Sequence, residues 1–127
     1  MTDAPTVLDA SAILALLQAE PGADEVEALL DGALMSCVNL AEVLQKAEQH
    51  GVPTEGLEYD LEALGIEFRD FDLPMARLTA EAWSPGAGLS LGDRTCLALT
   101  RLIRGIAITT DARWASADGT VDIQVIR

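Results

Sequence analysis

Short apolar runs alternate with longer amphipathic segments along this 127-residue chain, and this alternation limits the folds that it can adopt. The short runs predict strands near residues 5–9, 34–38, 66–71, 105–109 and 121–126. The longer segments predict helices near residues 10–19, 23–31, 40–50, 54–64, 73–83 and 91–104. Strands separated by helices pair in parallel, because each crossover returns the chain to the same end of the sheet. The pattern therefore predicts a three-layer α/β/α sandwich.

The residue pattern of each strand indicates its place in the sheet. The runs TVL, LMSCV and GIAI are continuously apolar, which is typical of central strands buried on both faces. IEFR and VDIQV alternate, which is typical of edge strands. With right-handed crossovers, these patterns predict a parallel sheet of about five strands in the order 3-2-1-4-5, within a single domain spanning residues 1–127. That order has a switch point between strands 1 and 4, where binding sites form at the carboxyl ends.

Composition limits the classes of protein that the chain can belong to. Half of the residues are hydrophobic, which indicates a globular domain and not a disordered one. The net charge is -13, and this acidity alone argues against a nucleic-acid partner. However, residues 1–72 hold 16 of the 21 acidic residues and only two of the eight basic ones. The acidity therefore says little about a site built largely from the rest of the chain.

The expected location follows from the cysteines and the apolar runs. Cys37 and Cys96 are far apart in apolar surroundings, which favours two unpaired residues in a reducing compartment. The N-terminus lacks a basic region, and Asp9 interrupts the early apolar run, so no secretion signal is expected. No apolar run approaches the roughly 20 residues that a membrane helix needs. We expect a cytoplasmic protein that does not bind membranes.

Four acidic residues lie at similar junctions between strands and helices. Asp9 ends the first strand, and Glu42 lies in the first turn of the helix after the second. Asp93 lies in the first turn of the helix opened by LSLGDRT, and Asp111 follows the fourth strand. In a parallel sheet these junctions share one edge, so the four carboxylates are expected to converge.

Helix capping offers a simpler explanation of the same acids. The stretches Asn39–Glu42 and Ser90–Asp93 have the spacing of capping boxes, and Asp9 and Asp111 are suitable N-caps. Capping explains the residue types but not their convergence, because two carboxylates about 4 Å apart repel by roughly 4 kcal/mol at an effective dielectric near 20. Such a cluster needs a cation, and oxygen ligands favour Mg²⁺ or Mn²⁺. A zinc site is not expected, since His50 is the single histidine.

Four short motifs carry a resemblance to a known family. They are VLDASA, NLAEV, LSLGDRTCLALT and TTDARW. In order and spacing they resemble the acidic motifs of the PIN-domain ribonucleases and, more narrowly, those of the VapC toxins of bacterial toxin–antitoxin pairs. Each motif is weakly specific, but together they span nearly the whole chain. The chain departs from the family after Asp111, where many relatives carry another polar or acidic residue and then Phe; here Trp114 takes the aromatic position.

The resemblance implies an endoribonuclease that uses Mg²⁺ or Mn²⁺, with Asp9, Glu42, Asp93 and Asp111 as its catalytic acids. One or two metal ions would activate water and stabilise the leaving oxygen. We expect Asp9 and Asp93 to bind metal directly, and Glu42 and Asp111 to complete the site directly or through water. The resemblance also implies structured RNA, often tRNA, as substrate, a VapB-type antitoxin as partner, and a homodimer.

Other polar residues near the four acids are expected to support them. Candidate hydrogen-bond donors to the metal ligands are Ser11, Asn39, Thr109 and Thr110, although each of them could merely cap or end its own element.

A possible RNA-binding stripe lies on the helix near residues 91–104. At 100° per residue, Arg94, Arg101 and Arg104 fall within an arc of about 80°. Such a stripe beside a metal site suits an RNA backbone. The alternative is that Arg101 and Arg104 only complement the helix C-terminus.

The sequence disfavours two other functional classes and leaves a third open. A phosphoacceptor receiver domain needs a lysine after the fifth strand, whereas the single lysine is Lys46. A haloacid-dehalogenase-type phosphatase needs D-x-D after the first strand, where this chain has Asp9-Ala-Ser-Ala. A PIN-like domain that binds RNA or a protein without cleaving stays open. If an antitoxin binds, the apolar faces of helices 10–19 and 40–50 are expected to line a groove for its helix.

Overall fold

The structure is a computed structural model that describes residues 4–116, 119 and 121–126. Within these residues, one sheet contains β1 (Thr6–Leu8), β2 (Leu34–Ser36), β3 (Glu67–Arg69), β4 (Ile106–Thr109) and β5 (Asp122–Val125). All neighbouring strands are parallel, and their order is β3-β2-β1-β4-β5. This confirms the predicted order and the predicted edge strands.

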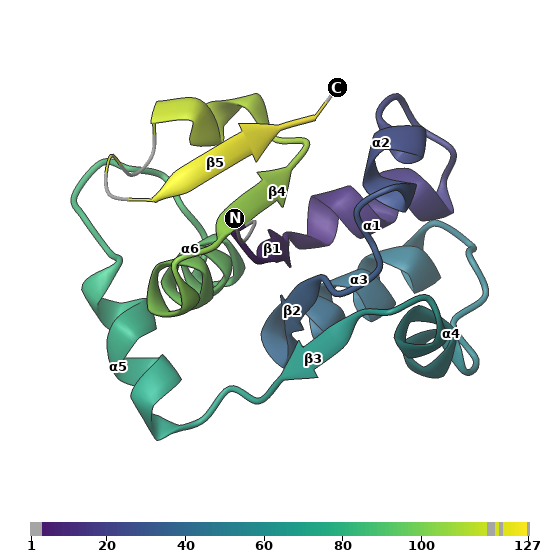
Figure 1. The fold of residues 1–127 in the computed structure, drawn as a ribbon, viewed down its shortest axis with the longest axis horizontal. Helices are drawn as coiled ribbons and strands as arrows, with labels where there is room; N and C mark the ends of the chain where they lie inside the picture. The colour runs from purple at the N-terminus through teal and green to yellow at the C-terminus, as the bar shows by residue number, and fades with distance from the viewer. Residues whose placement is uncertain (1–3, 117–118, 120, 127) are drawn as a thin grey trace.

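Helices cover both faces of the sheet. They are α1 (Ala10–Leu17), α2 (Ala23–Glu27), α3 (Cys37–Gln49), α4 (Leu57–Ala63), α5 (Leu73–Glu81), α6 (Leu91–Ile103) and the 3₁₀ helix η1 (Ala112–Ser116). α1 to α4 lie on one face, and α5, α6 and η1 lie on the other (Figure 1). The predicted α/β/α sandwich is therefore confirmed.

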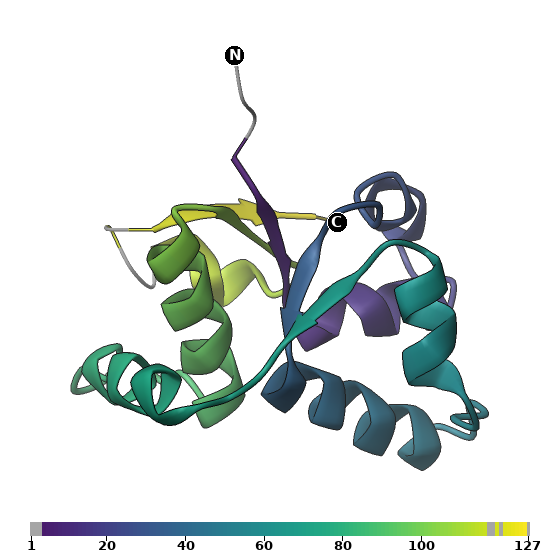
Figure 2. The ribbon, with the colours of Figure 1, turned by 60° about the horizontal axis from the view of Figure 1, so that its bottom comes forward.

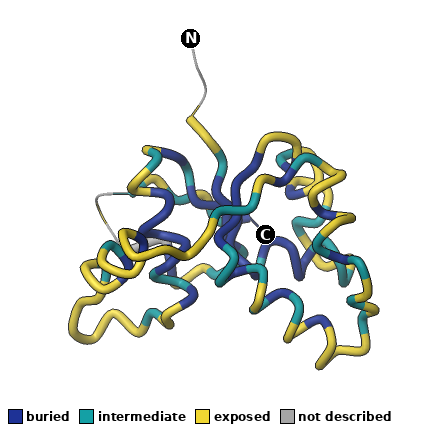
Figure 3. The backbone as a smooth tube through the Cα atoms, turned by 90° about the horizontal axis from the view of Figure 1, so that it is seen from below, coloured by how far each residue is buried: buried dark blue, intermediate teal, exposed yellow. Residues whose placement is uncertain are grey.

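Strand side chains divide the interior into two cores, because successive side chains of a strand point to opposite faces. Leu8 and Ile108 belong to the core under α1 to α4, whereas Val7 and Ala107 belong to the core under α6, where Trp114 is fully buried. Figure 3 shows these buried segments in the middle of the molecule and exposed turns around them. None of the helices in the described ranges is long and apolar enough to cross a membrane.

The boundary between β2 and α3 differs from the prediction. The strand ends at Ser36 and the helix begins at Cys37, three residues earlier than expected. Ser36 adopts an extended backbone, and its hydroxyl accepts a hydrogen bond from the Val38 backbone N–H, so it caps the helix. Asn39 therefore lies inside the helix, and the capping box expected at Asn39–Glu42 is not formed.

Several helices are shorter than predicted, and left-handed residues follow α1 and α6. After α1, Ala19 has φ 51°, and α2 starts after Gly22 with φ 94° and covers only Ala23–Glu27. α6 ends at Ile103 because Arg104 adopts φ 55°. The 3₁₀ helix after β4 was not predicted.

The apolar faces of α1 and α3 are largely used by the fold. On α1, Ile13 and Leu14 are buried, and on α3, Val43 and Ala47 are buried. Leu16, Leu17, Leu40 and Leu44 are half-buried against the same core. The large exposed hydrophobic side chains come from other segments: Tyr59, Leu64, Phe71, Leu73, Trp83, Leu91 and Leu102. The large apolar side chains that α1 and α3 leave for the predicted groove are therefore half-buried and not exposed.

Candidate active site

The sheet topology brings the four predicted acids to one pocket. β1 and β4 end near the N-terminal parts of α3 and α6 (Figure 2). The pocket has a volume of about 350 Å³. Its lining residues are Asp9, Ala10, Ser11, Glu42, Lys46, Gly88, Ser90, Asp93, Asp111 and Arg113.

Asp9 is held by two hydroxyl groups and does not cap its helix. It occupies the N-cap position of α1, but its carboxylate accepts no capping hydrogen bond. Instead Ser11 Oγ and Thr109 Oγ1 both donate to Asp9 Oδ2, at 2.8 and 3.0 Å. The backbone N–H groups of Thr110 and Asp111 donate in turn to Ser11 Oγ and Thr109 Oγ1. The amides orient the hydroxyls, and the hydroxyls orient the carboxylate.

The surroundings of Asp9 disfavour its charged form. Its side chain is buried, and burial is the main reason why its pKa is raised from 3.8 to about 6. The negative charges of Asp93 and Glu42 raise the pKa further, while the bonds from Ser11 and Thr109 lower it. A cation beside Asp9 would offset both the burial and the repulsion.

Glu42 is positioned by contacts between α3 and α6. Asn39 Nδ2 donates to Glu42 Oε1 at 2.9 Å and to the backbone oxygen of Gly92 at 3.0 Å. Gly92 leaves the space that the carboxylate fills, because a Cβ added there would collide with the Glu42 side chain. Asn39 is fully buried, and its Oδ1 has no hydrogen-bond partner. An unpartnered acceptor in this cluster is consistent with a cation or water held nearby.

Asp93 serves in the capping box predicted at Ser90–Asp93. Its backbone N–H donates to Ser90 Oγ, and its Oδ2 accepts from the Ser90 backbone N–H, each at 3.0 Å. The carboxylate therefore caps α6 and lines the pocket at the same time. Capping and a role in the site are compatible at this residue.

Asp111 is bound to a neighbouring arginine. Arg113 Nη2 lies 2.6 Å from Asp111 Oδ2, and its Nε donates to both carboxylate oxygens. The Arg113 backbone N–H also donates to Asp111 Oδ1, which caps the start of η1. The contact with Asp111 is the main cause that raises the pKa of Arg113. A cation already compensates this carboxylate.

The chemistry of the donor set fits a hard divalent cation, although the side chains are not gathered around one point. In the described part of the chain, no three His, Cys, Asp or Glu side chains are placed to hold one ion together. The pocket nevertheless offers carboxylate oxygens from four segments, and charge repulsion reaches Asp9 from two of them. Oxygen donors of this kind suit Mg²⁺ or Mn²⁺. Direct coordination by several acids requires rotation of their side chains.

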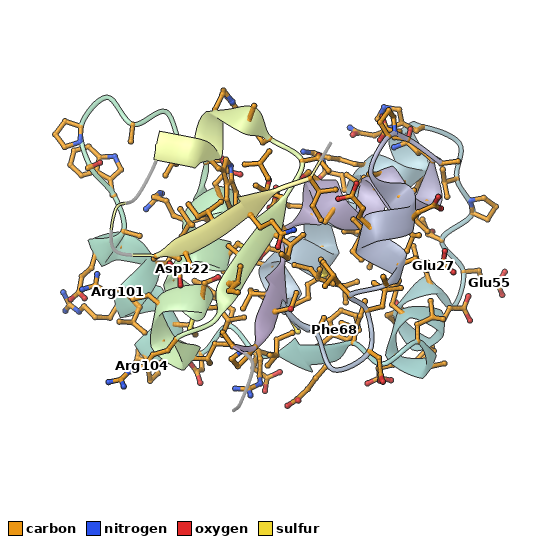
Figure 4. The ribbon with its side chains drawn as sticks, turned by 45° about the horizontal axis from the view of Figure 1, so that its top comes forward. Glu27, Glu55, Phe68, Arg101, Arg104 and Asp122 are labelled. Atoms are coloured by element: carbon orange, nitrogen blue, oxygen red, sulfur yellow. The ribbon has the colours of Figure 1, made fainter. Side chains whose placement is uncertain are left out.

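The three predicted RNA-binding arginines do not line this pocket. Arg94 is half-buried. Its Nη1 donates to the backbone oxygen of Thr79, which belongs to α5, at 3.2 Å. Arg101 and Arg104 line a different pocket together with Asp122, near the end of α6 (Figure 4). That end of the helix leads into the start of β4, away from the carboxyl edge. Their role in RNA binding stays a prediction.

The sequence analysis missed three residues of the site: Lys46 and Arg113, which line the pocket, and Gly92, which leaves room for the Glu42 carboxylate. Lys46 follows Glu42 by four residues, a spacing that places both on one face of a helix and so could have indicated its position. Arg113 follows Asp111 by two residues in an unpredicted 3₁₀ turn, so its ion pair had no signal in a regular pattern. The space that Gly92 leaves is visible only once α3 and α6 are packed.

Comparisons of structure give the same architecture. The chain is similar to a toxin–antitoxin complex from Klebsiella pneumoniae, with a TM-score of 0.74 and 18% identity, over 94% of this chain and 96% of that one. It is also similar to VapBC2 from Rickettsia felis bound to a promoter DNA fragment, with a TM-score of 0.70 and 11% identity, over 96% and 98%. At such identities the likeness shows a common fold.

The chain is an α/β domain in which four carboxylates line one pocket at the carboxyl ends of a parallel sheet. The family follows from sequence, because the PIN-domain family model matches residues 6–120. The chain belongs to the PIN domain family, whose members are generally nucleases. A search of curated proteins finds no match.

Proposed function

We propose that this chain is a metal-dependent endoribonuclease and the VapC-type toxin of a toxin–antitoxin pair, with structured RNA, in particular tRNA, as substrate. The observation that carries the proposal is the pocket in which Asp9, Glu42, Asp93 and Asp111 converge. The family match supports nuclease chemistry, and the neighbouring toxin–antitoxin structures support the toxin assignment.

The four acids would hold Mg²⁺ or Mn²⁺, with Asp9 and Asp93 as direct ligands. When bound, the metal supplies an activated water and stabilises the leaving oxygen of the phosphodiester. Ser11 and Thr109 fix the Asp9 carboxylate through its Oδ2. Asn39 fixes Glu42.

The remaining contacts set the charge of the site. The capping bonds with Ser90 hold the Asp93 carboxylate at the pocket. Arg113 neutralises Asp111, which leaves Asp111 less available to a metal than the other three acids. We therefore assign Asp111 an auxiliary role.

The partner proposals rest on the neighbours and on the sequence. A VapB-type antitoxin is expected because both neighbours are toxin–antitoxin assemblies. A homodimer is expected from the family resemblance. A cytoplasmic location is expected from the same resemblance and from Cys37 and Cys96, which are both free. Light scattering of the purified protein, alone and with the product of the adjacent gene, tests both assemblies. A monomer at tens of micromolar, with no change in mass on addition of that product, would contradict the homodimer and the antitoxin complex.

Cleavage of total tRNA by antitoxin-free protein tests the activity. We expect cleavage with Mg²⁺ or Mn²⁺, none with EDTA, and loss in Asp9→Asn, Glu42→Gln and Asp93→Asn, which keep the side-chain shapes and remove only charge. Glu55→Gln is the matched control, because Glu55 is exposed and does not line the pocket. Folded variants that cleave like the parent would contradict a catalytic role for these acids. Sequencing the RNA ends then identifies the target.

A second candidate is a PIN-like domain that binds RNA or a partner without cleaving. Two observations favour it. No three carboxylates of the described residues are placed to hold one ion, and Arg113 forms an ion pair with Asp111. Metal binding separates the candidates. Thermal unfolding that moves upward with millimolar Mg²⁺ or Mn²⁺, relative to matched NaCl, supports the nuclease, since a metal that binds only the folded site stabilises it. An unchanged melting temperature supports the binding domain.

A further inference from the structure

The acidic pocket contains two basic side chains, Lys46 and Arg113, and they differ in their contacts. Arg113 is bound to Asp111 through three side-chain hydrogen bonds. Lys46 is exposed, and no carboxylate of the described residues lies within 4.0 Å of its ammonium group. Its positive charge at the pocket is therefore available to a ligand.

The position of Lys46 on α3 directs it to the pocket. Asn39, Glu42 and Lys46 are spaced by three and four residues, so they lie on one face of the helix. Val43 and Ala47, on the neighbouring face, are buried in the core and fix the rotation of α3. The same packing that presents Glu42 to the site thus presents Lys46 one turn further along.

The other described basic residues lie elsewhere. Arg69 pairs with Glu67 on β3, and Arg94 donates to the Thr79 backbone oxygen. Arg77 lines an apolar groove on α5, and Arg101 and Arg104 line the pocket beside Asp122. An anionic substrate that enters the acidic pocket therefore meets Lys46 as the available cation among these residues.

We propose that Lys46 binds a backbone phosphate of the RNA beside the acidic pocket. This inference rests on the proposed function, since it names how that site takes its substrate. Four carboxylates repel a polyanion, and a metal shared among them neutralises only part of that charge. A lysine is a compact charge on a flexible stem, which suits a phosphate whose exact position varies with the RNA. Lys46 is thereby a substrate-positioning residue and not a metal ligand.

A merely structural role for Lys46 predicts different results. A lysine near the C-terminal end of a helix interacts favourably with the helix dipole, so its loss would lower stability slightly and leave RNA binding unchanged. If Lys46 contacts a phosphate, its loss should weaken RNA binding. The weakening should hold for every RNA sequence, and the salt dependence of binding should fall.

RNA binding is measured by fluorescence anisotropy with labelled tRNA in EDTA, where metal-dependent cleavage is suppressed, at several salt concentrations. We expect Lys46→Ala to weaken binding about three- to tenfold and to lower the salt slope by about 0.7 to 0.9. Lys46→Arg should retain most of the affinity, and Lys46→Gln provides a second neutral variant. Arg77→Ala is the matched control, because Arg77 is exposed and lines neither the acidic pocket nor the pocket beside Asp122. In Mg²⁺, Lys46→Ala should raise KM more than it lowers kcat.

The outcomes separate this inference from the proposed function. If the parent cleaves RNA and Lys46→Ala binds with parental affinity and salt slope, Lys46 has no phosphate contact and the nuclease proposal stands. If Lys46→Ala weakens binding but the parent never cleaves, the phosphate contact stands and the nuclease proposal fails. If Arg77→Ala weakens binding as much as Lys46→Ala, the effect is one of net charge and the inference is overturned.

Discussion

Asp9 and Asp111 occupy equivalent positions in the chain but opposite environments in the fold. Each follows a central strand and lines the same pocket. Asp9 is 4% exposed and is held by two neutral hydroxyls. Asp111 has a side chain that is 23% exposed and is held by a guanidinium group.

A position at a strand end therefore does not by itself define a metal ligand. Neutral donors hold the Asp9 carboxylate in place without supplying a positive charge, so its charge remains uncompensated. The guanidinium supplies that charge to Asp111 already. A cation should therefore be bound most strongly at the Asp9 side of the pocket.

The largest expected effect is on catalysis. Asp9→Asn should reduce RNA cleavage by at least about 100-fold, which exceeds the roughly 10- to 100-fold cost of losing a partner of a metal ligand. Asp111→Asn should reduce cleavage by about tenfold or less, because Asp111 is already neutralised. Rates measured under single-turnover conditions compare the two. Equal losses would erase the distinction between the two carboxylates.

The next effect is on stability and its dependence on pH. The folded-state pKa of Asp9 is about 6 and its unfolded value is 3.8. Between these values the folded protein retains a proton that the unfolded chain has lost, so stability falls as pH rises from about 4 to about 6. The loss at this one residue is as much as about 3 kcal/mol and is complete above pH 6.

Urea unfolding of the metal-free protein between pH 4 and pH 8 measures this dependence. The other carboxyl groups titrate in the same range, so the decisive quantity is the difference between the parent and Asp9→Asn. That variant should gain stability relative to the parent as pH rises. Asp111→Asn should show no such gain, and a constant difference between parent and Asp9→Asn would contradict the raised pKa.

A smaller effect is expected from the hydroxyls that hold Asp9. Thr109→Val removes a donor to Asp9 and the acceptor of the Asp111 backbone N–H, which should cost about 1 to 3 kcal/mol. The pKa of Asp9 should rise further, as NMR titration of its carboxyl carbon would show. Thr100→Val is the control, since that buried hydroxyl donates to the Cys96 backbone oxygen within its own helix. It should cost stability without moving the pKa of Asp9.

The smallest effect is expected at Arg113. Arg113→Ala should tighten Mn²⁺ binding by a few-fold, because it releases the Asp111 carboxylate, and should leave the melting temperature unchanged because the ion pair is exposed. Electron paramagnetic resonance of free Mn²⁺ measures the affinity. Arg69→Ala, which breaks an exposed ion pair with Glu67, is the matched control. Weaker Mn²⁺ binding in Arg113→Ala would mean that Arg113 organises the site and does not compete with the metal.

Much of the fold was predictable from local patterns. Continuously apolar and alternating runs distinguish central from edge strands, because a strand buried on both faces turns neither set of side chains to solvent and is therefore mostly apolar. The order β3-β2-β1-β4-β5 followed from that distinction and from crossover handedness. The start of α3 was wrong, because an apolar run across Leu34 to Val38 looks the same whether it is strand or helix, and only the Ser36 cap decides.

Local patterns alone indicated the junctions at which Asp9, Asp93 and Asp111 stand, since Asp9 and Asp111 follow recognisable strands and Asp93 lies in the first turn of a recognisable helix. Glu42 was expected in the first turn of its helix, but α3 begins at Cys37 and places it in the second turn. Only the tertiary structure decided how they differ. Asp9 meets Thr109 across 100 residues of chain, and Asn39 reaches the Gly92 backbone across 53. Charge, burial and hydrogen bonding depend on neighbours in space, and a pattern of residue types along the chain does not encode the distances between segments that pack together only after folding.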